Sequence, residues 1–308
     1  HLGDWEKSVE FAGAPREAAV CFTDPETGTV FVSLGLGAKS AELTDTYYFN
    51  DEGGEGLNWK KVTGVNSEFP AEENPGEGTN IGNGRHSAVA FVIGEWAYVG
   101  TGYVPAFSDN EKYVRNRTYF NDFYRFNMKT KQWDSKRFVM RVNGVEVEGR
   151  RDAVAFSDGE YGYVGTGYGE NNRVFKDFYR FDPNTETWEE ISFPGESRYG
   201  GTAFVVNNAA YVCLGAKSVG GSSSYATDVV KFDFATKTWE KMFNSLTDKP
   251  GVKQDKDYDR IPRVYAISFV SNKGNDVSLI KVQLLHDDII LGENSFTTGA
   301  IDSYQYNK

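Results

Sequence analysis

Short strand-like runs recur five times along the chain, each ending in an aromatic residue: AVCF, AVAF, AVAF, GTAF and AISF. An arginine stands three residues before each run, and these arginines are Arg16, Arg85, Arg150, Arg198 and Arg263. Runs of this length, rich in Val, Phe and Tyr and bounded by Gly, Asn, Asp and Pro, are typical of β-strands. Recurrence at a regular interval indicates one supersecondary unit that must stack on its copies to bury its apolar face.

Two further positions repeat after each arginine. A glycine closes the next apolar run, and an aspartate then opens a run of alternating aromatic residues such as NDFYRFN and KDFYRFD. The glycines are Gly35, Gly102, Gly167, Gly215 and Gly292, and the aspartates are Asp45, Asp122, Asp177, Asp228 and Asp302. A tryptophan opens a fourth run, eleven residues after the aspartate in three repeats. The pattern therefore predicts four antiparallel strands in each repeat, named A to D here.

The fifth repeat lacks its own tryptophan. Asp302 is followed by only six residues, and Trp5 is the fifth residue of the chain, so joining the two ends restores the eleven-residue spacing. Such a closed ring removes the exposed sheet edges that an open array would leave. We expect residues near 4–11 to pair with residues near 302–308. One domain is expected over 1–308, with repeats at about 12–64, 85–140, 150–193, 198–245, and 263–308 plus 1–11.

This arrangement of arginine, apolar strand, glycine-bearing strand, aromatic residue and tryptophan resembles the kelch repeat, which is a four-stranded blade. The resemblance implies a five-bladed kelch-type β-propeller, all-β, with the N-terminal strand completing the last blade. The segments YVGTGY (98–103 and 163–168), NDFYRFN and PNTETW resemble kelch lipoproteins and secreted propellers of Bacteroidetes. Repeats one, four and five depart from the GTG pattern and read SLG, CLG and ILG.

Residues shared by all repeats are expected to serve as scaffold. Strand A begins at the face to which strand B returns, so the arginine, the glycine and the aspartate of one repeat should meet there. The predicted structural ring comprises Arg16, Arg85, Arg150, Arg198, Arg263, Asp45, Asp122, Asp177, Asp228 and Asp302. Ion pairs of this kind fix geometry more surely than they add stability. The alternative is a positive ring that captures an anion.

Function is expected where the repeats disagree beside each arginine. The two positions after the arginine and the first position of the B–C loop vary strongly, and loops on a rigid scaffold are the usual carriers of binding. The candidate ligand-binding residues are Glu17, His86, Tyr103, Tyr113, Arg151, Asp152, Tyr168, Tyr199 and Tyr265. The alternative is that these residues differ between repeats only because solvent-exposed loop positions accumulate substitutions without a function.

Insertions extend the same region. The second repeat takes twenty residues from Gly102 to Asp122, and Phe107, Tyr113, Tyr119, Arg115 and Arg117 could stack on a sugar or clasp a peptide there. Residues 249–263 form a second insertion, whose acidic residues match a calcium loop poorly. In repeat five, the alternating segment VSLIKVQLL is expected to form an extra hairpin on the opposite face.

Composition narrows the function classes. The net charge of -11 argues against a nucleic-acid partner, and no apolar stretch is long enough to span a membrane. The chain begins with His1 and not with Met, so any leader or lipid anchor is expected to have been cut away or to lie outside this sequence. The resemblance to secreted and lipoprotein kelch propellers implies the periplasm or cell surface. Cys21 and Cys213 occupy small-residue strand positions and are expected to be buried and unpaired. No metal or cofactor is expected.

The favoured function is therefore a noncatalytic binding or scaffolding propeller, expected to be a monomer, that engages a protein or carbohydrate ligand through the arginine-bearing face. The alternative is a carbohydrate-active enzyme at the channel mouth, either epimerase- or mutarotase-like or galactose oxidase-like. An oxidase would need two histidines at one metal, whereas His86 and His286 fall in different parts of the repeats. An epimerase or glycosidase could draw on Arg151, Asp152 and Glu17.

Overall fold

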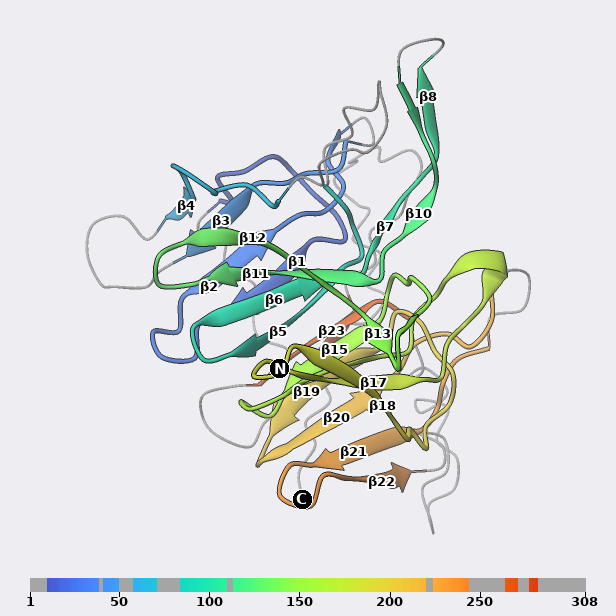
Figure 1. Cartoon of the computed structure of the whole chain (residues 1–308). Helices are drawn as coiled ribbons and strands as arrows, with labels where there is room; N and C mark the ends of the chain where they lie inside the picture. The colour runs from blue at the N-terminus through green and yellow to red at the C-terminus, as the bar shows by residue number, and fades with distance from the viewer. Residues whose placement is uncertain are drawn as a thin grey trace, which may run out of the picture. The chain divides into compact units, whose positions relative to one another are not determined.

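A computed structural model describes residues 10–38, 41–49, 58–70, 84–109, 113–219, 224–243, 264–270 and 277–281. Its regular elements are β-strands, apart from short 3₁₀ turns such as η2 (Glu170–Asn172) (Figure 1). Residues 1–9 and 282–308, which the sequence predicts to close the ring, lie outside the described residues. So do Arg263, Gly292 and Asp302.

Four antiparallel sheets of four strands follow one another along the chain. The first contains β1 (Val20–Thr23), β2 (Val30–Ser33), β3 (Thr46–Phe49) and β4 (Trp59–Lys61). The second contains β5 (Val89–Ile93), β6 (Trp96–Gly100), β11 (Asp122–Asn127) and β12 (Gln132–Val139). The third contains β15 (Val154–Ser157), β16 (Gly162–Gly165), β17 (Phe178–Asp182) and β18 (Thr187–Ile191). The fourth contains β19 (Thr202–Val206), β20 (Ala209–Cys213), β21 (Val229–Asp233) and β22 (Thr238–Phe243). The prediction of four-stranded antiparallel blades is confirmed for these repeats.

A further sheet of two strands pairs β23 (Ala266–Val270) with β24 (Val277–Lys281). The sequence predicted that residues 277–281 would belong to an extra hairpin on the opposite face. That prediction was wrong for these five residues, because β24 pairs along the whole length of β23, where a second strand of the repeat is expected.

Three small ribbons lie outside the sheets. They pair β7 (Tyr103–Val104) with β10 (Thr118–Tyr119), β8 (Phe107–Asp109) with β9 (Tyr113–Arg115), and β13 (Arg141–Val142) with β14 (Val145–Glu146). The insertion of the second repeat is therefore a long β-ribbon, which extends away from the sheets of its repeat (Figure 1).

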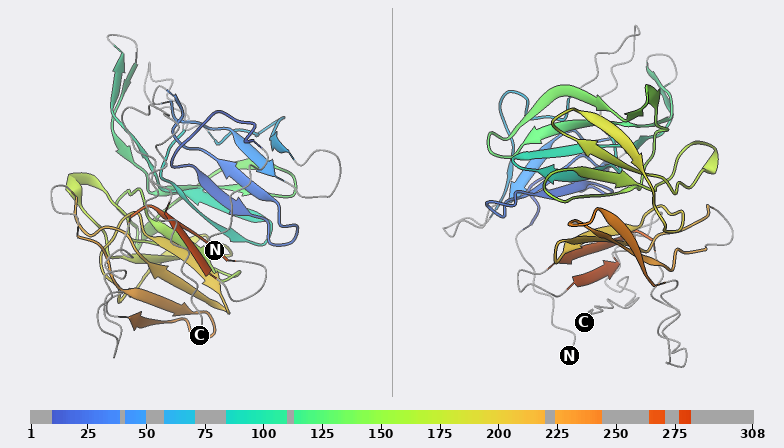
Figure 2. Two further views of the ribbon diagram at one scale, coloured as in Figure 1. Left: turned by 180° about the vertical axis from the view of Figure 1, so that it is seen from behind. Right: turned by 60° about the horizontal axis from the view of Figure 1, so that its bottom comes forward.

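The chain divides into two compact units. Unit 1 comprises His1–Arg151, Gly159–Gly162 and Phe181–Trp188, and unit 2 comprises Asp152–Asp158, Tyr163–Arg180 and Glu189–Lys308. Within unit 1 the first strands of neighbouring sheets, β1 and β5, lie side by side. Within unit 2 the same is true of β15 and β19, and of β19 and β23 (Figure 2).

Aromatic side chains fill the space between neighbouring sheets. Trp133 opens the fourth strand of the second sheet and donates from Nε1 to Thr46 of the first sheet at 3.1 Å. Trp239 of the fourth sheet packs on Phe178 of the third, with ring centroids 5.1 Å apart. The predicted role of these tryptophans as packing between sheets is confirmed, and each buries a large apolar area.

The two cysteines differ in environment. Cys213 is 3% exposed, as predicted, but the prediction of burial was wrong for Cys21, whose side chain is exposed. Successive side chains of a strand point to opposite faces, and β1 turns Val20 and Phe22 into the core, which leaves Cys21 on the other face. Desolvation by surrounding protein still raises the pKa of the Cys21 thiol to about 11, and burial raises that of Cys213 to about 12.

Candidate functional site

The repeated arginines join three strand ends within one sheet. Arg16 donates from Nη1 to Asp45 at 2.9 Å and to the Leu34 carbonyl at 3.1 Å. Arg85 donates in the same way to Asp122 at 2.6 Å and to the Thr101 carbonyl at 3.2 Å. Each arginine thus holds the start of strand A against the end of strand B and the start of strand C.

The fourth sheet repeats this arrangement. Arg198 pairs with Asp228 and donates to the Leu214 carbonyl at 3.2 Å. In the third repeat Arg150 is fully buried in unit 1, while Asp177 in unit 2 accepts a hydrogen bond from Tyr179 at 2.9 Å.

Asp122 carries its charge in a buried position. Burial alone would raise the pKa of this carboxyl, but Arg85 and Arg137 hold it below its usual range. Arg137 donates from Nε to the second carboxylate oxygen at 2.6 Å. Two guanidinium partners favour the ionised form strongly enough to outweigh desolvation.

The repeated glycines connect each sheet to the next. Gly35 donates its N–H to the Arg85 carbonyl at 3.0 Å, and Gly167 donates to the Arg198 carbonyl at 2.7 Å. Gly102 has a φ of +97°, and a Cβ there would lie 2.8 Å from the His86 carbonyl oxygen. Glycine is required at this position by both conformation and space.

In three repeats the position directly after the arginine pairs with the first residue of the B–C loop. Glu17 and Leu36 exchange two backbone hydrogen bonds of 2.9 Å, and Tyr199 and Ala216 exchange two of 3.0 Å. His86 pairs with Tyr103 in the same antiparallel manner. The variable positions therefore lie next to one another, because the backbone brings them together whatever their side chains are.

The next position adopts a left-handed conformation in all five repeats. The residues and their φ angles are Ala18 (48°), Ser87 (57°), Asp152 (53°), Gly200 (59°) and Tyr265 (58°). Each of three N–H groups donates to the carbonyl of the equivalent residue in the preceding repeat: Ser87 to Ala18, Gly200 to Asp152, and Tyr265 to Gly200, at 2.8 to 2.9 Å. A non-glycine residue in this conformation is uncommon and is retained only where its surroundings fix it.

In unit 1, three of the candidates form a cluster, which we call the His86 cluster. His86 lies edge-on to Tyr103 with ring centroids 5.3 Å apart, and the Arg151 guanidinium lies 4.8 Å from the Tyr103 ring centroid. Tyr119 of β10 packs on Tyr103 at 4.7 Å. Aromatic faces next to a guanidinium suit a planar or sugar-like ligand.

The ribbon of the second repeat separates the aromatic residues that the sequence grouped together. Tyr119 lies at the base of the ribbon and pairs with Tyr103, and Arg117 lies 6.0 Å from the Tyr119 ring centroid. Tyr113 lies in β9 and pairs with Asp109, six residues further along the ribbon. Tyr113 therefore belongs to a separate strand pair beyond the one that contains Tyr103, so placing Tyr113 beside Tyr103 was wrong.

In unit 2, three candidate tyrosines form a row, which we call the tyrosine row. Tyr199 lies between Tyr168 and Tyr265, with ring centroids 5.7 and 6.2 Å away. Tyr168 is 9% exposed and Tyr265 is 49% exposed, so the row runs from the protein interior to the surface. The Tyr265 hydroxyl donates to Asp152 at 3.4 Å.

One residue of this region was missed by sequence reasoning. Asn172, in η2, accepts a hydrogen bond from the Tyr168 hydroxyl at 2.6 Å and fixes the ring. Asn171 and Asn172 both have positive φ. The Asn-Asn pair directly after GYGE was the available signal, since asparagine favours such turns.

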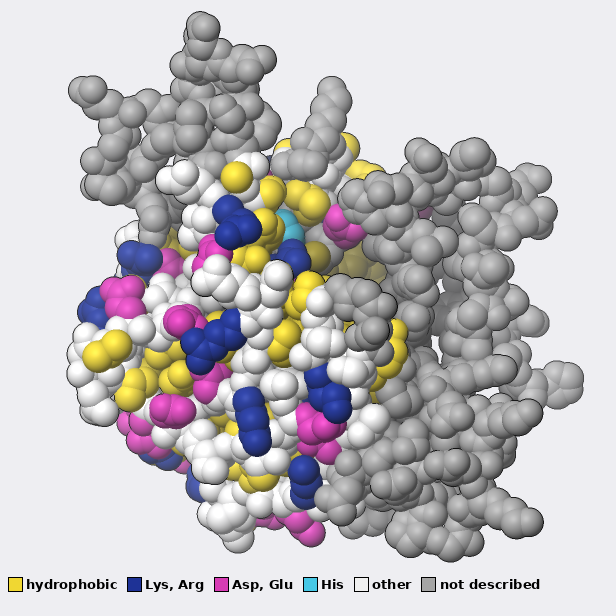
Figure 3. Space-filling view, turned by 90° about the vertical axis from the view of Figure 1, so that its right-hand side faces the viewer, with side chains coloured by type: hydrophobic (Ala, Val, Ile, Leu, Met, Phe, Trp, Pro, Cys, Tyr) yellow, Lys and Arg dark blue, Asp and Glu magenta, His cyan; other side chains and the backbone are white. Residues whose placement is uncertain are grey.

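The surface carries mixed charge. On the face shown in Figure 3, basic and acidic side chains of the described residues alternate among hydrophobic ones, without a large area of one sign. Within the described ranges, no group of three or more His, Cys, Asp or Glu side chains is arranged to hold a metal ion. The same part of the chain contains no helix long and apolar enough to cross a membrane.

Comparison with known proteins identifies the repeat. A family model described as the KLHDC2/KLHL20/DRC7 Kelch-repeats domain matches residues 5–215 and 113–254. The solved structure titled "Structure of YjhT" is similar at a TM-score of 0.60 and 17% identity, over 88% of this chain and 74% of that chain, which is a likeness of fold. The comparison with curated proteins gave no match. Since the family model covers more than half of the sequence, this chain belongs to the Kelch-repeat family, as its resemblance to the kelch β-propeller predicted.

Proposed function

We propose that this chain is a noncatalytic binding or scaffolding propeller that engages a protein or a glycan through its arginine-bearing face. One observation carries the proposal. The second position after each arginine keeps one backbone conformation in all five repeats, yet the first position beside it holds residues as different as Glu17, His86, Arg151 and Tyr199. Packing against a repeated scaffold gives no reason for such different side chains, whereas an asymmetric ligand does.

The chemistry of these positions fits recognition. The tyrosine row offers aromatic faces next to the carboxylate of Asp152, and the His86 cluster offers a ring beside the Arg151 guanidinium. Tyrosine supplies a large contact area at a small entropic cost, which suits both sugar rings and peptides. Kelch propellers also mediate interactions with other proteins.

The proposal extends to the whole ring. In it, five blades form one domain over residues 1–308, the N-terminal strand completes the last blade, and the propeller is a monomer. Deletion of residues 1–11 should then lower the midpoint of thermal unfolding by at least about 10 °C, because the last blade loses a strand. An unchanged midpoint would contradict closure by the N-terminal strand.

The proposed location is the periplasm or the cell surface, with a lipid anchor on the precursor. The support is the resemblance of YVGTGY and NDFYRFN to secreted and lipoprotein kelch propellers. Fractionation of cells that express the full precursor, with and without globomycin, tests this location. Recovery in the cytoplasm would contradict it.

Binding itself can be tested with a glycan array and with affinity capture from an extracellular protein fraction. Tyr265→Ala and Tyr103→Ala should each weaken binding about tenfold or more, since exposed aromatic anchors dominate such interfaces. Val205→Ala is a matched control, because Val205 is 39% exposed and belongs to β19. Equal binding by all variants would contradict binding through the arginine-bearing face. Turnover of a bound saccharide would contradict the noncatalytic function and favour the carbohydrate-active enzyme.

A further inference from the structure

Tyr265 differs from the packed aromatic residues of the chain because about half of its side chain meets solvent. Among the side chains that the structure describes, the strongly exposed large hydrophobic ones are four valines and Tyr265, which is 49% exposed. Its neighbour in the tyrosine row, Tyr199, lies with its ring centroid 6.2 Å away at an interplanar angle of 64°. At the inner end of the row, Tyr168 is 9% exposed. The row therefore offers the Tyr265 ring as its main accessible aromatic surface.

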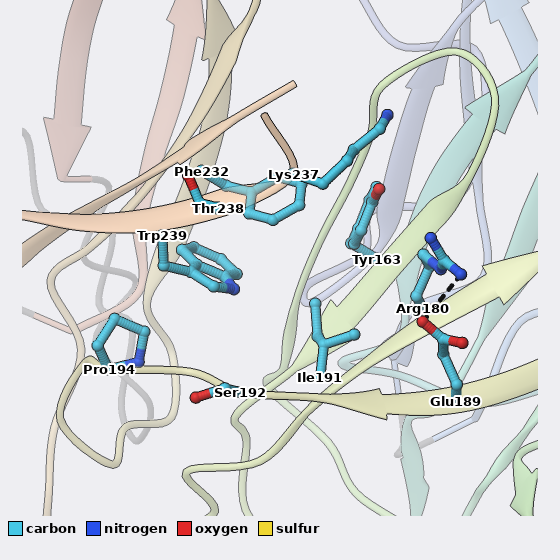
Figure 4. A pocket seen from close by; sticks show the side chains of 10 residues that line it. All are labelled: Tyr163, Arg180, Glu189, Ile191, Ser192, Pro194, Phe232, Lys237, Thr238 and Trp239. Carbon is cyan, nitrogen blue, oxygen red and sulfur yellow. Dashed lines mark ion pairs between the residues drawn. The ribbon is translucent and has the colours of Figure 1, made fainter. Parts of the chain in front are cut away.

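The cleft between the third and fourth sheets offers no comparable ring. It has a volume of about 400 Å³, and Tyr163, Phe232 and Lys237 are among the residues that line it (Figure 4). Tyr163 is 0% exposed and Phe232 is 2% exposed, since the two rings pack on each other at 4.9 Å. Lys237 pairs with the buried Asp158. These groups hold the two sheets together.

Gly200 leaves the space that the Tyr265 ring occupies. In the other four repeats the equivalent position has the same left-handed φ and carries a side chain, so conformation alone does not require glycine here. A Cβ on Gly200 would lie 2.9 Å from two carbons of the Tyr265 ring and 2.5 Å from a methyl group of Val264. Such contacts are too short for carbon atoms in a packed structure. Space therefore accounts for the glycine, and one side of the Tyr265 ring rests against it.

Main-chain and side-chain contacts hold the Tyr265 ring in place. Its N–H donates to the Gly200 carbonyl at 2.8 Å, and its hydroxyl donates to Asp152 at 3.4 Å. The φ of Tyr265 is +58°, which is uncommon for a bulky residue. Strain of this kind persists only where the surroundings fix a residue, and it is concentrated at binding sites. A ring that is already fixed loses little conformational entropy when a ligand stacks on it.

A single fixed ring suits a sugar better than a protein or a cation. The face of an aromatic ring is electronegative, and the C–H groups on one face of a pyranose are weakly electropositive, so the two surfaces attract. A protein interface needs about 800 Å² from each partner, with several anchors at its centre. A cage for an ammonium group needs several open aromatic faces, whereas Tyr168 is buried. The carboxylate of Asp152 at the hydroxyl end of Tyr265 disfavours an acidic sugar.

We propose that the exposed side of Tyr265 stacks on a pyranose ring of a neutral saccharide. This inference rests on the binding function proposed above and names the class of ligand for one part of the arginine-bearing face. Tyr265 contacts the sugar. Gly200 and Asp152 are positioning residues, because they set where the Tyr265 ring lies.

Saturation-transfer NMR tests the contact directly. The probes are the methyl β-glycosides of glucose, galactose and N-acetylglucosamine, with the methyl β-glycoside of glucuronic acid as the acidic counterpart. At least one neutral glycoside should receive saturation at its ring C–H protons, and titration gives its Kd. The glucuronide should bind at least about fivefold more weakly than the glucoside, because its carboxylate is repelled by Asp152.

Variants separate the ring from its support. Tyr265→Ala should weaken binding about tenfold or more, and Tyr265→Phe should stay within about threefold, since the hydroxyl makes only a long hydrogen bond. Gly200→Ala should weaken binding about fivefold or more, because the new Cβ displaces the ring. Gly144→Ala is the matched control, with a positive φ and no atom within 4 Å of its Cβ, and it should leave binding unchanged.

The outcomes distinguish this inference from the function on which it rests. Equal binding by Tyr265→Ala and the parent protein overturns the stacking site, and a Gly200→Ala variant that binds like the parent overturns the positioning role of Gly200. If no neutral glycoside binds while Tyr265→Ala still lowers capture of a protein partner, the sugar assignment is overturned and the binding face stands. If Tyr265→Ala and Tyr103→Ala change neither measurement, both proposals are overturned. Should Tyr265→Ala not fold, Tyr265→Leu takes its place.

Discussion

Arg85 donates to Asp122 at 2.6 Å, and both side chains are completely buried. The corresponding pair of the first sheet, Arg16 and Asp45, has the same form, but the Asp45 side chain is 16% exposed. The repeated Arg–Asp pair thus occurs in unit 1 once fully buried and once partly exposed to water. The contributions of the two pairs to the free energy of unfolding should therefore differ.

Loss of the buried arginine should be costly. Arg85→Met leaves a desolvated carboxylate with Arg137 as its remaining basic partner, and we expect a loss of about 3–5 kcal/mol in the free energy of unfolding. Arg16→Met should cost about 1–2 kcal/mol, since water can reach Asp45. Urea denaturation measures both. Equal losses would contradict the role of burial, and the double variant Arg85→Met with Asp122→Leu should recover part of the stability.

The same carboxylate should make stability depend on pH. Its pKa is lower in the folded chain than in the unfolded chain, so the unfolded state binds the proton first as the pH falls. The contribution of Asp122 is present above about pH 4 to 5, and it is lost as the pH falls through the folded-state pKa. Asp122→Asn should therefore flatten the dependence of the unfolding free energy between pH 6 and pH 3. A variant with the wild-type slope would contradict this assignment.

Gly102 should tolerate alanine poorly. The substitution combines a φ of +97° with a Cβ at 2.8 Å from the His86 carbonyl oxygen, and we expect it to cost about 3 kcal/mol. Gly144→Ala is the matched control, with a φ of +81° and no atom within 4 Å of the new Cβ, and it should cost about 1 kcal/mol. Thermal denaturation of both variants isolates the steric part. Similar losses of stability in the two variants would show that the positive φ alone, without the steric contact, explains why glycine is needed at position 102.

Cys21 should react slowly although it is exposed. A thiol with a pKa of about 11 is almost fully protonated at pH 8, so labelling by a disulfide reagent should be roughly tenfold slower than for an ordinary free cysteine. The rate should rise about tenfold per pH unit up to pH 10. Cys21→Ser should remove the labelling seen in the native state, because Cys213 is buried. A fast reaction at pH 7 would contradict the raised pKa.

Much of the repeat could be predicted because its signals are local. The spacing from Arg85 to Gly102 and Asp122 places three strand ends together wherever a four-stranded unit repeats, and the structure brings these residues into contact. The count of five blades and the closure of the ring stay predictions, because Trp5 and Asp302 lie outside the described residues.

Other features depend on contacts that spacing does not encode. Phe138 and Phe193 are both five residues after a tryptophan, but Phe138 packs on Tyr98 and Phe181, whereas Phe193 packs on Phe178 and Trp239. Their surroundings differ because β12 continues through Phe138 and β18 ends at Ile191. Cys21 aligns with the small residues Ala90, Ala155, Ala203 and Ser268 of the other first strands, and strand alternation turns it away from the core. The strand pairing of the inserted ribbon likewise separates Tyr113 from Tyr103, which are near in sequence.

The hydrogen bonds between the left-handed positions use only main-chain atoms. Ser87 donates to Ala18, Gly200 donates to Asp152, and Tyr265 donates to Gly200. Natural selection can therefore exchange the neighbouring side chains without loosening the frame that presents them. A saturation library at Glu17, His86 and Tyr199 should consist mostly of folded proteins with altered recognition, which makes the chain a starting point for the evolution of new binding specificities.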